Sequence, residues 1–175
     1  MKISELRKKT SLTDEMVTSL NKQVANEAHS AAVYQAMSSW LHYQGLIESG
    51  KYFRKQSEEE RGHMYKIHDY LLDMGAQAIS PEITDIPNNF SDLREILDMY
   101  LGMEIGITKN FNDLSEKALK LKDFQTLQFL AWFLEEQKEE EDNARRTIEI
   151  YELIGTELDG LFKIDKYIGK LAEEA

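Results

Sequence analysis

Glu60 and His63 are the residues of this chain whose types and spacing most clearly suggest chemistry. They lie in a stretch from Lys51 to Met74 in which apolar residues recur at helical spacing. Residues three apart share one face of a helix, so both side chains fall on the apolar stripe that should face a core. Burying a carboxylate and an imidazole is costly unless they are paired or bind a metal. A solvated charged face would explain Glu58 and Glu59, but the phase of Glu60 and His63 makes them metal-ligand candidates.

Three further stretches with helical periodicity also carry an acid on an otherwise apolar stripe. Four like charges brought together inside a fold raise one another's pKa and destabilise it. Two divalent cations would balance four carboxylates. Oxygen ligands with one imidazole and no sulfur suit iron or manganese better than copper or structural zinc. The acids are Glu27 in the stretch 13–43, Glu104 in 92–120 and Glu140 in 124–154, where Gln137 shares the stripe.

The composition favours one all-helical domain spanning residues 1–175. The chain has 175 residues, of which 42% are hydrophobic, and long runs rich in Ala, Leu, Glu, Lys and Met. The net charge of −11 disfavours nucleic acid as a partner and suits a protein that attracts cations. Because the chain has no cysteine, it cannot form disulfides, thiolate zinc sites or iron–sulfur clusters.

No apolar run is long enough for a membrane span, and the segment from Met1 to Thr10 lacks the apolar core of a secretory signal. We therefore expect no membrane partner. A cytoplasmic location fits these features.

Turn residues divide the chain into four long helices and a short one. Thr13 and Ser91 are N-cap candidates, and Gly45 is a stop signal. The short link 44–50 predicts an antiparallel first pair. At ~3.3 Å per residue, the proline-containing link 76–91 reaches roughly 50 Å, more than the ~38 Å of a 25-residue helix. It can therefore cross the whole bundle. The expected helices are about 13–43, 51–74, 92–120, 124–154 and 158–172.

The last of these helices is amphipathic. A closed four-helix bundle leaves its apolar face without a partner, so we expect it to pack between subunits.

Taken together, these motifs resemble those of the bacterial non-haem ferritins from Thr13 to about Leu171. The resemblance implies a ferritin-like four-helix bundle with a long crossover between helices two and three and a short fifth, C-terminal helix. The matching motifs are Asn26-Glu27 with Tyr34, Glu59-Glu60-Arg61-Gly62-His63, Met103-Glu104, Leu130-Ala131-Trp132-Phe133, and Glu135-Glu136-Gln137-Lys138-Glu139-Glu140-Glu141.

The same resemblance implies an iron-storage protein with a ferroxidase centre that oxidises Fe(II) with O2 or H2O2. The implied ligands are Glu27, Glu60 and His63 for iron A; Glu60, Glu104 and Glu140 for iron B, with Gln137 nearby; and Glu59, Glu136, Glu139 and Glu140 for a third iron. It further implies a homo-oligomeric hollow shell of twenty-four subunits that stores ferric mineral. The fifth helix would line a channel at the fourfold axis.

Tyr34 lies two turns after Glu27 on the same face. It is either a core aromatic with a satisfied hydroxyl or a hydrogen-bond partner of a ligand that donates an electron during oxidation. From the residues alone, the two roles weigh equally.

Two departures from haem-containing bacterioferritins indicate that no haem is bound. Those proteins place the haem-ligating methionine directly after the second-helix glutamate, where this chain has Arg61. They also repeat Glu-x-x-His on the fourth helix, where this chain reads Gln137 to Glu140.

A rival hypothesis is a non-catalytic helical scaffold whose acids bind calcium or magnesium weakly. Such a site prefers oxygen ligands only and has no use for His63.

Overall fold

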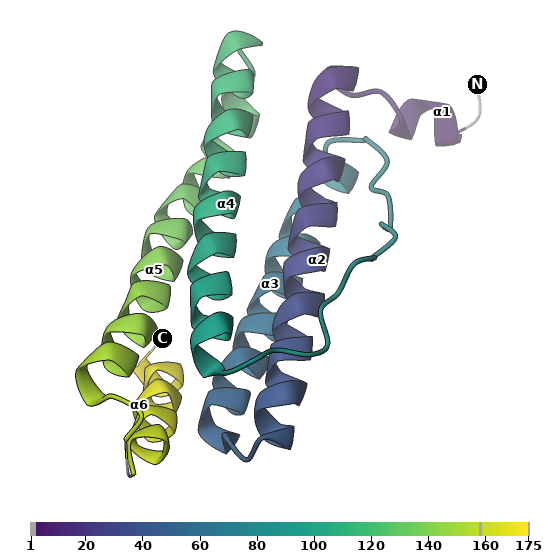
Figure 1. Ribbon diagram of the computed structural model, residues 1–175. Helices are drawn as coiled ribbons and strands as arrows, with labels where there is room; N and C mark the ends of the chain where they lie inside the picture. The colour runs from purple at the N-terminus through teal and green to yellow at the C-terminus, as the bar shows by residue number, and fades with distance from the viewer. Residues whose placement is uncertain (1–2, 158, 175) are drawn as a thin grey trace.

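The computed structural model describes residues 3–157 and 159–174, and every regular element in this part of the chain is a helix. The predicted bundle with a long crossover and a short fifth helix is confirmed (Figure 1). An additional short helix at the N-terminus was not predicted. The helices are α1 (Ile3–Arg7), α2 (Asp14–Tyr43), α3 (Ile47–Asp73), α4 (Leu93–Lys120), α5 (Phe124–Ile154) and α6 (Gly160–Glu174).

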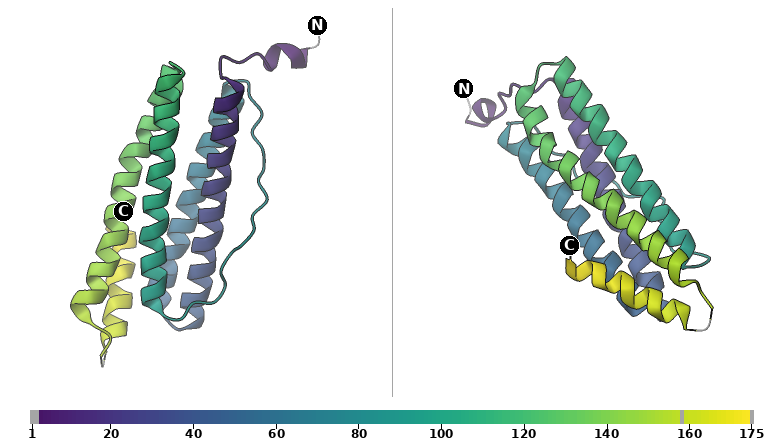
Figure 2. Two further views of the ribbon diagram at one scale, coloured as in Figure 1. Left: turned by 45° about the horizontal axis from the view of Figure 1, so that its top comes forward. Right: turned by 90° about the vertical axis from the view of Figure 1, so that its left-hand side faces the viewer.

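The crossover between α3 and α4 runs alongside α2 for most of the length of the bundle (Figures 1 and 2). Asn21 on α2 fixes its first part: its side-chain amide donates to the carbonyl of Gln77 at 3.0 Å, and its oxygen accepts from the N–H of Ile79 at 2.8 Å. The crossover brings the chain back to the end of the bundle where α3 began. α4 therefore runs parallel to α3, as the length of the link predicted.

Side-chain caps begin three of the long helices, and in α5 the cap is Asp123, which accepts from the N–H of Thr126 at 3.0 Å. Thr13 accepts a hydrogen bond from the N–H of Met16 at 3.2 Å, so the predicted N-cap of α2 is confirmed. In α4 the predicted cap is wrong by one residue. Asp92 is the N-cap and accepts from the N–H of Glu95, whose carboxylate in turn accepts from the N–H and hydroxyl of Ser91.

α3 begins at Ile47, four residues before the predicted start at Lys51, because a residue far away in the sequence contacts its first turn. No side chain of the preceding link caps it. Instead, Asp165 on α6 accepts from the N–H of Ser49 at 2.7 Å and of Glu48 at 3.2 Å. Gly50, which as a sequence signal indicates a turn, lies inside the helix, where a Cβ atom would lie 2.2 Å from Nδ1 of His42.

The expectation that the C-terminal helix has no partner within the chain is wrong. α6 packs against α3 and α5 of its own bundle (Figure 2, right). Its apolar residues Ile164, Ile168 and Leu171 are buried in one cluster with Tyr52 of α3. The four long helices leave an apolar surface at this end, and α6 covers it.

The core consists of two apolar clusters, one towards each end of the bundle. The first includes the C-terminal half of α2, the N-terminal part of α4 and α6, and the second includes the N-terminal half of α2 and the C-terminal half of α4. Buried polar side chains occupy the layer between the clusters. Among the described residues, no helix is long and apolar enough to cross a membrane.

Candidate metal centre

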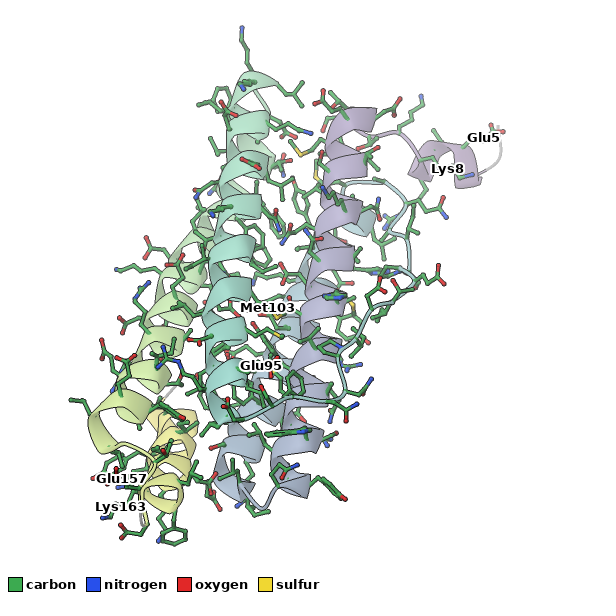
Figure 3. All side chains as sticks on the ribbon, in the orientation of Figure 1. Glu5, Lys8, Glu95, Met103, Glu157 and Lys163 are labelled. Atoms are coloured by element: carbon green, nitrogen blue, oxygen red, sulfur yellow. The ribbon has the colours of Figure 1, made fainter. Side chains whose placement is uncertain are left out.

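The polar layer between the two clusters contains the residues that the sequence singled out. On α4, Met103 lies near the middle of the helix, and the next residue is Glu104 (Figure 3). The helical phase places one acid from each long helix at this height. The buried members are Glu27 on α2, Glu60 and His63 on α3, Glu104 on α4, and Gln137 and Glu140 on α5, all at most 4% exposed.

Glu27, Glu60 and His63 form the tighter part of the centre. Each offers one ligand atom, and these atoms lie within 4.8 Å of one another. Nδ1 of His63 is 3.4 Å from Oε2 of Glu60. Those two atoms and Oε2 of Glu27 are buried without a hydrogen-bond partner. Buried polar atoms are normally satisfied, so this arrangement fits a cation that the three residues would share.

Glu104 is held by two neighbours. The hydroxyl of Tyr34 donates to its Oε1, and the amide of Gln137 donates to its Oε2 at 3.1 Å. Burial raises the pKa of Tyr34, with the nearby carboxylates adding to the effect, so this tyrosine remains a donor. The three predicted ligands of iron B do not form a group as tight as that of Glu27, Glu60 and His63. These ligands are Glu60, Glu104 and Glu140.

A second tight group lies at the edge of the centre. Glu59, Glu136 and Glu140 bring carboxylate oxygens within 4.8 Å of one another. Glu59 and Glu136 are half-buried, and Glu140 is buried. The fourth predicted member of this site, Glu139, is exposed and is not part of the tight group. It lines a surface pocket together with Glu136.

The carboxyl groups of the centre resist ionisation. Burial, reinforced by neighbouring carboxylates, raises the pKa of Glu27 well above its usual 4.5, and burial likewise raises that of Glu60. Burial raises the pKa of Glu104 to about 7. Burial with the charges of Glu104 and Glu59 raises that of Glu140 to about 9. A divalent cation stabilises the ionised forms, so its binding would displace protons.

Three polar residues around the centre were not predicted as site residues. Each lies one helical turn before a ligand candidate: Gln23 before Glu27, Gln56 before Glu60 and Tyr100 before Glu104. The signal that could have identified them is this spacing, because it places a polar group on an otherwise apolar stripe.

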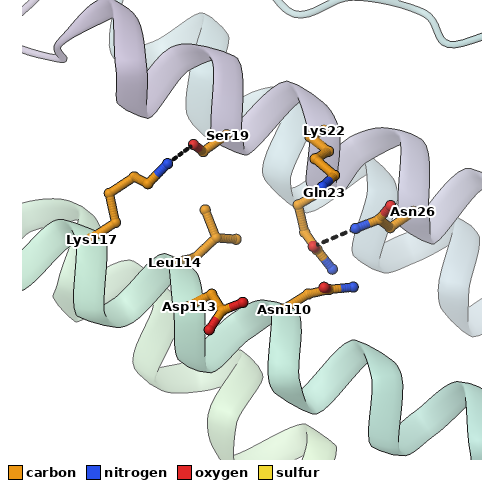
Figure 4. A pocket seen from close by; sticks show the side chains of 8 residues that line it. All are labelled: Ser19, Lys22, Gln23, Asn26, Asn110, Asp113, Leu114 and Lys117. Carbon is orange, nitrogen blue, oxygen red and sulfur yellow. Dashed lines mark hydrogen bonds between the residues drawn. The ribbon is translucent and has the colours of Figure 1, made fainter.

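Gln23 connects the centre with the surface. Its amide donates to Oε1 of Glu27 at 2.6 Å, and its oxygen accepts from Asn26 at 2.9 Å. Figure 4 shows both residues in a pocket of about 180 Å³ between α2 and α4, with Asn110 and Asp113 on the opposite wall.

Known proteins match this chain over most of its length. The family described as "Ferritin-like domain" matches residues 17–154. The bacterial non-heme ferritin of Campylobacter jejuni subsp. jejuni is 34% identical over 161 residues, which cover 92% of this chain and 96% of that protein. The bacterial non-heme ferritin of Escherichia coli is 34% identical over 163 residues, covering 91% and 97%.

Solved structures agree with these relatives. The open pore ferritin of the hyperthermophilic archaeon Archaeoglobus fulgidus has a TM-score of 0.88 and 31% identity, covering 91% of this chain and 98% of that one. The Chlorobium tepidum ferritin has a TM-score of 0.80 and 38% identity, with the same coverage of 91% and 98%. With the family matched over most of the chain and the fold shared, this protein belongs to the ferritin family, and it resembles the bacterial non-heme ferritins.

Proposed function

We propose that this chain oxidises Fe(II) at an intrasubunit di-iron ferroxidase centre and stores the ferric product inside a hollow shell. The observation that carries the proposal is the buried group of Glu27, Glu60 and His63, whose free ligand atoms converge without hydrogen-bond partners. Membership in the ferritin family and the names of the relatives support iron storage. The imidazole in the group argues against a calcium or magnesium scaffold, because those ions prefer oxygen ligands.

Iron is the substrate of this centre, and the ligand sets are those expected from the family resemblance. Iron A is held by Glu27, Glu60 and His63, and Glu60 bridges to iron B. Glu104, Glu140 and Gln137 complete the second position. A third iron is held by Glu59, Glu136, Glu139 and Glu140. No haem takes part.

The chemistry needs two Fe(II) ions and one oxidant. Each Fe(II) gives up one electron. Dioxygen accepts both electrons with two protons and becomes hydrogen peroxide, whereas hydrogen peroxide accepts them with two protons and becomes two waters. The residues hold the two ions close together and keep open positions for the oxidant, while the metal carries the redox change. Tyr34, hydrogen-bonded to Glu104, orients that carboxylate.

The proposal includes a cytoplasmic shell of twenty-four identical subunits. Two structural neighbours are an open pore ferritin and an engineered closed form of the Archaeoglobus fulgidus ferritin, which supports assembly around a cavity. Several large apolar side chains of this chain are strongly exposed, as expected for surfaces that meet other subunits. They include Tyr43, Phe124, Leu153 and Phe162.

Addition of Fe(II) in air to metal-free protein tests the function. We expect the ferric absorbance to rise much faster than in a protein-free control, and the same sample to sediment as one large species. Oxidation at the control rate, together with binding of calcium or magnesium, would favour the scaffold. Oxidation by a monomer would contradict the shell but leave the centre.

A further inference from the structure

Two buried side chains outside the ligand sets connect two carboxylates of the third iron position. The amide of Gln56 donates to Oε2 of Glu59 at 3.0 Å. The hydroxyl of Tyr100 donates to Oε1 of Gln56 and lies 3.3 Å from Oε2 of Glu140. Gln56 and Tyr100, which we call the brace, therefore link Glu59 on α3 to Glu140 on α5.

The hydroxyl of Tyr100 has three oxygen neighbours but only one hydrogen. It donates that hydrogen to Gln56 or to Glu140, and the hydroxyl of Tyr52, 3.0 Å away, supplies a hydrogen to its oxygen. A hydrogen bond to an ionised carboxylate is shorter and stronger than one between neutral groups. The hydroxyl of Tyr100 can therefore stay hydrogen-bonded to Glu140 when that carboxylate turns towards a cation.

Packing alone does not explain these two polar groups. The ring of Tyr100 meets Phe53 at 5.3 Å and Tyr34 at 5.4 Å between centroids, and both contacts would survive loss of the hydroxyl. Burying a hydroxyl and an amide is favourable only when both are hydrogen-bonded. Here the partners at the two ends of the network are carboxylates that face each other across the second tight group.

We propose that Gln56 and Tyr100 are positioning residues that set the geometry of the third iron position. The inference rests on the proposed function and names the residues that control one of its steps. Glu140 belongs to the expected ligand sets of both iron B and the third iron, so a brace that orients it governs how readily an ion passes from one position to the other. Neither Gln56 nor Tyr100 needs to touch iron to act in this way.

Anaerobic titration of the full-length protein with Fe(II), followed by calorimetry, tests the brace. The variants are Tyr100→Phe, which keeps the ring, and Gln56→Met, which keeps the chain length. Tyr70→Phe is the matched control, because it removes a tyrosine hydroxyl of α3 that bonds Thr126 and touches neither the brace nor a carboxylate of the centre. We expect both brace variants to weaken the third binding step about tenfold, the effect of losing one hydrogen bond to a charged group. The first step should be unchanged, and the control should bind like the wild type.

Thermal unfolding of each metal-free variant separates positioning from a structural role. Weakening of every step in proportion to a fall in unfolding temperature would overturn the proposal, and so would a third step that is unchanged in both brace variants. A wild-type protein that binds no Fe(II) would overturn the proposed function and the brace together. The brace is supported if the wild type binds Fe(II) in three steps and the brace variants lose affinity only in the third step.

Discussion

At the scale of single residues, the centre is marked by buried atoms that the fold leaves unpaired. Oε2 of Glu60 and Oε1 of Gln137 have no hydrogen-bond partner although both residues are at most 2% exposed. Each such atom costs roughly 1–3 kcal/mol. A cation that accepts these lone pairs would offset the cost, so iron binding should stabilise the folded chain.

In the proposed centre, Glu60 is the ligand that both iron positions share. We predict that Glu60→Gln slows rapid Fe(II) oxidation by about 100-fold or more, since a ligand should matter at least as much as the residues that support ligands. The metal-free variant should stay folded, because it loses a buried like charge. Stopped-flow oxidation checks this, with the exposed neighbour Glu58→Gln as control. Oxidation at the wild-type rate in Glu60→Gln would rule out its bridging role.

The raised pKa values predict how stability of the metal-free protein depends on pH. The pKa is about 7 for Glu104 and about 9 for Glu140, both above the usual 4.5. The folded state therefore keeps protons that the unfolded state releases, and the free energy of unfolding falls as the pH rises from about 5 to about 9. Unfolding temperatures across this range measure the effect. Glu140→Gln should flatten its upper part, and a flat wild-type profile would contradict the shifts.

Sequence spacing predicted that the ligand candidates are buried, because an acid on the apolar stripe of a helix can be recognised in one helix at a time. Glu27, Glu60, His63, Glu104 and Glu140 all lie in the centre. The residues that support them were not predicted. Gln23 and Gln56 bond acids on their own helices at spacings that the sequence contains, whereas helical spacing does not reveal the contacts of Tyr100 with α3 and α5.

At the scale of elements, local signals predicted the four long helices and the crossover, whereas contacts between distant elements decided the exceptions. α3 starts early because Asp165 of α6 caps it, and a glycine occurs within the helix at position 50 because a side chain there would clash with His42. No residue near Ile47 announces either contact. The cap by Asp165 also ties α6 to α3, next to the apolar cluster in which α6 is buried.

α6 should therefore contribute measurably to the stability of its own bundle. Ile168→Ala removes a fully buried side chain and should lower the free energy of unfolding by roughly 2–5 kcal/mol. Asp165→Ala removes the cap of α3 and should cost about 1 kcal/mol. Denaturant unfolding of metal-free protein gives both values, with Lys166→Ala on the exposed face of α6 as control. Losses no larger than the control's would mean that α6 is not part of the bundle core.

At the scale of the whole molecule, one bundle combines a buried centre with an acidic edge. The net charge of −11 attracts Fe(II). The half-buried Glu59 and Glu136 lie between solvent and the buried ligands. In the proposed centre, ions enter and leave through this edge, and the apolar clusters on either side hold the ligands in place. Such a centre suits iron that passes through on its way to storage.

In the proposed ferroxidase centre, two irons are oxidised together in each subunit. Freeze-quench Mössbauer spectroscopy of the assembled protein, given two isotopically enriched Fe(II) per subunit and then oxygen, tests it most directly. We expect most of the iron to pass through a spin-coupled diferric pair, and we expect this pair to be absent in Glu60→Gln. Magnetically isolated ferric ions in the wild type from the earliest time point would contradict it.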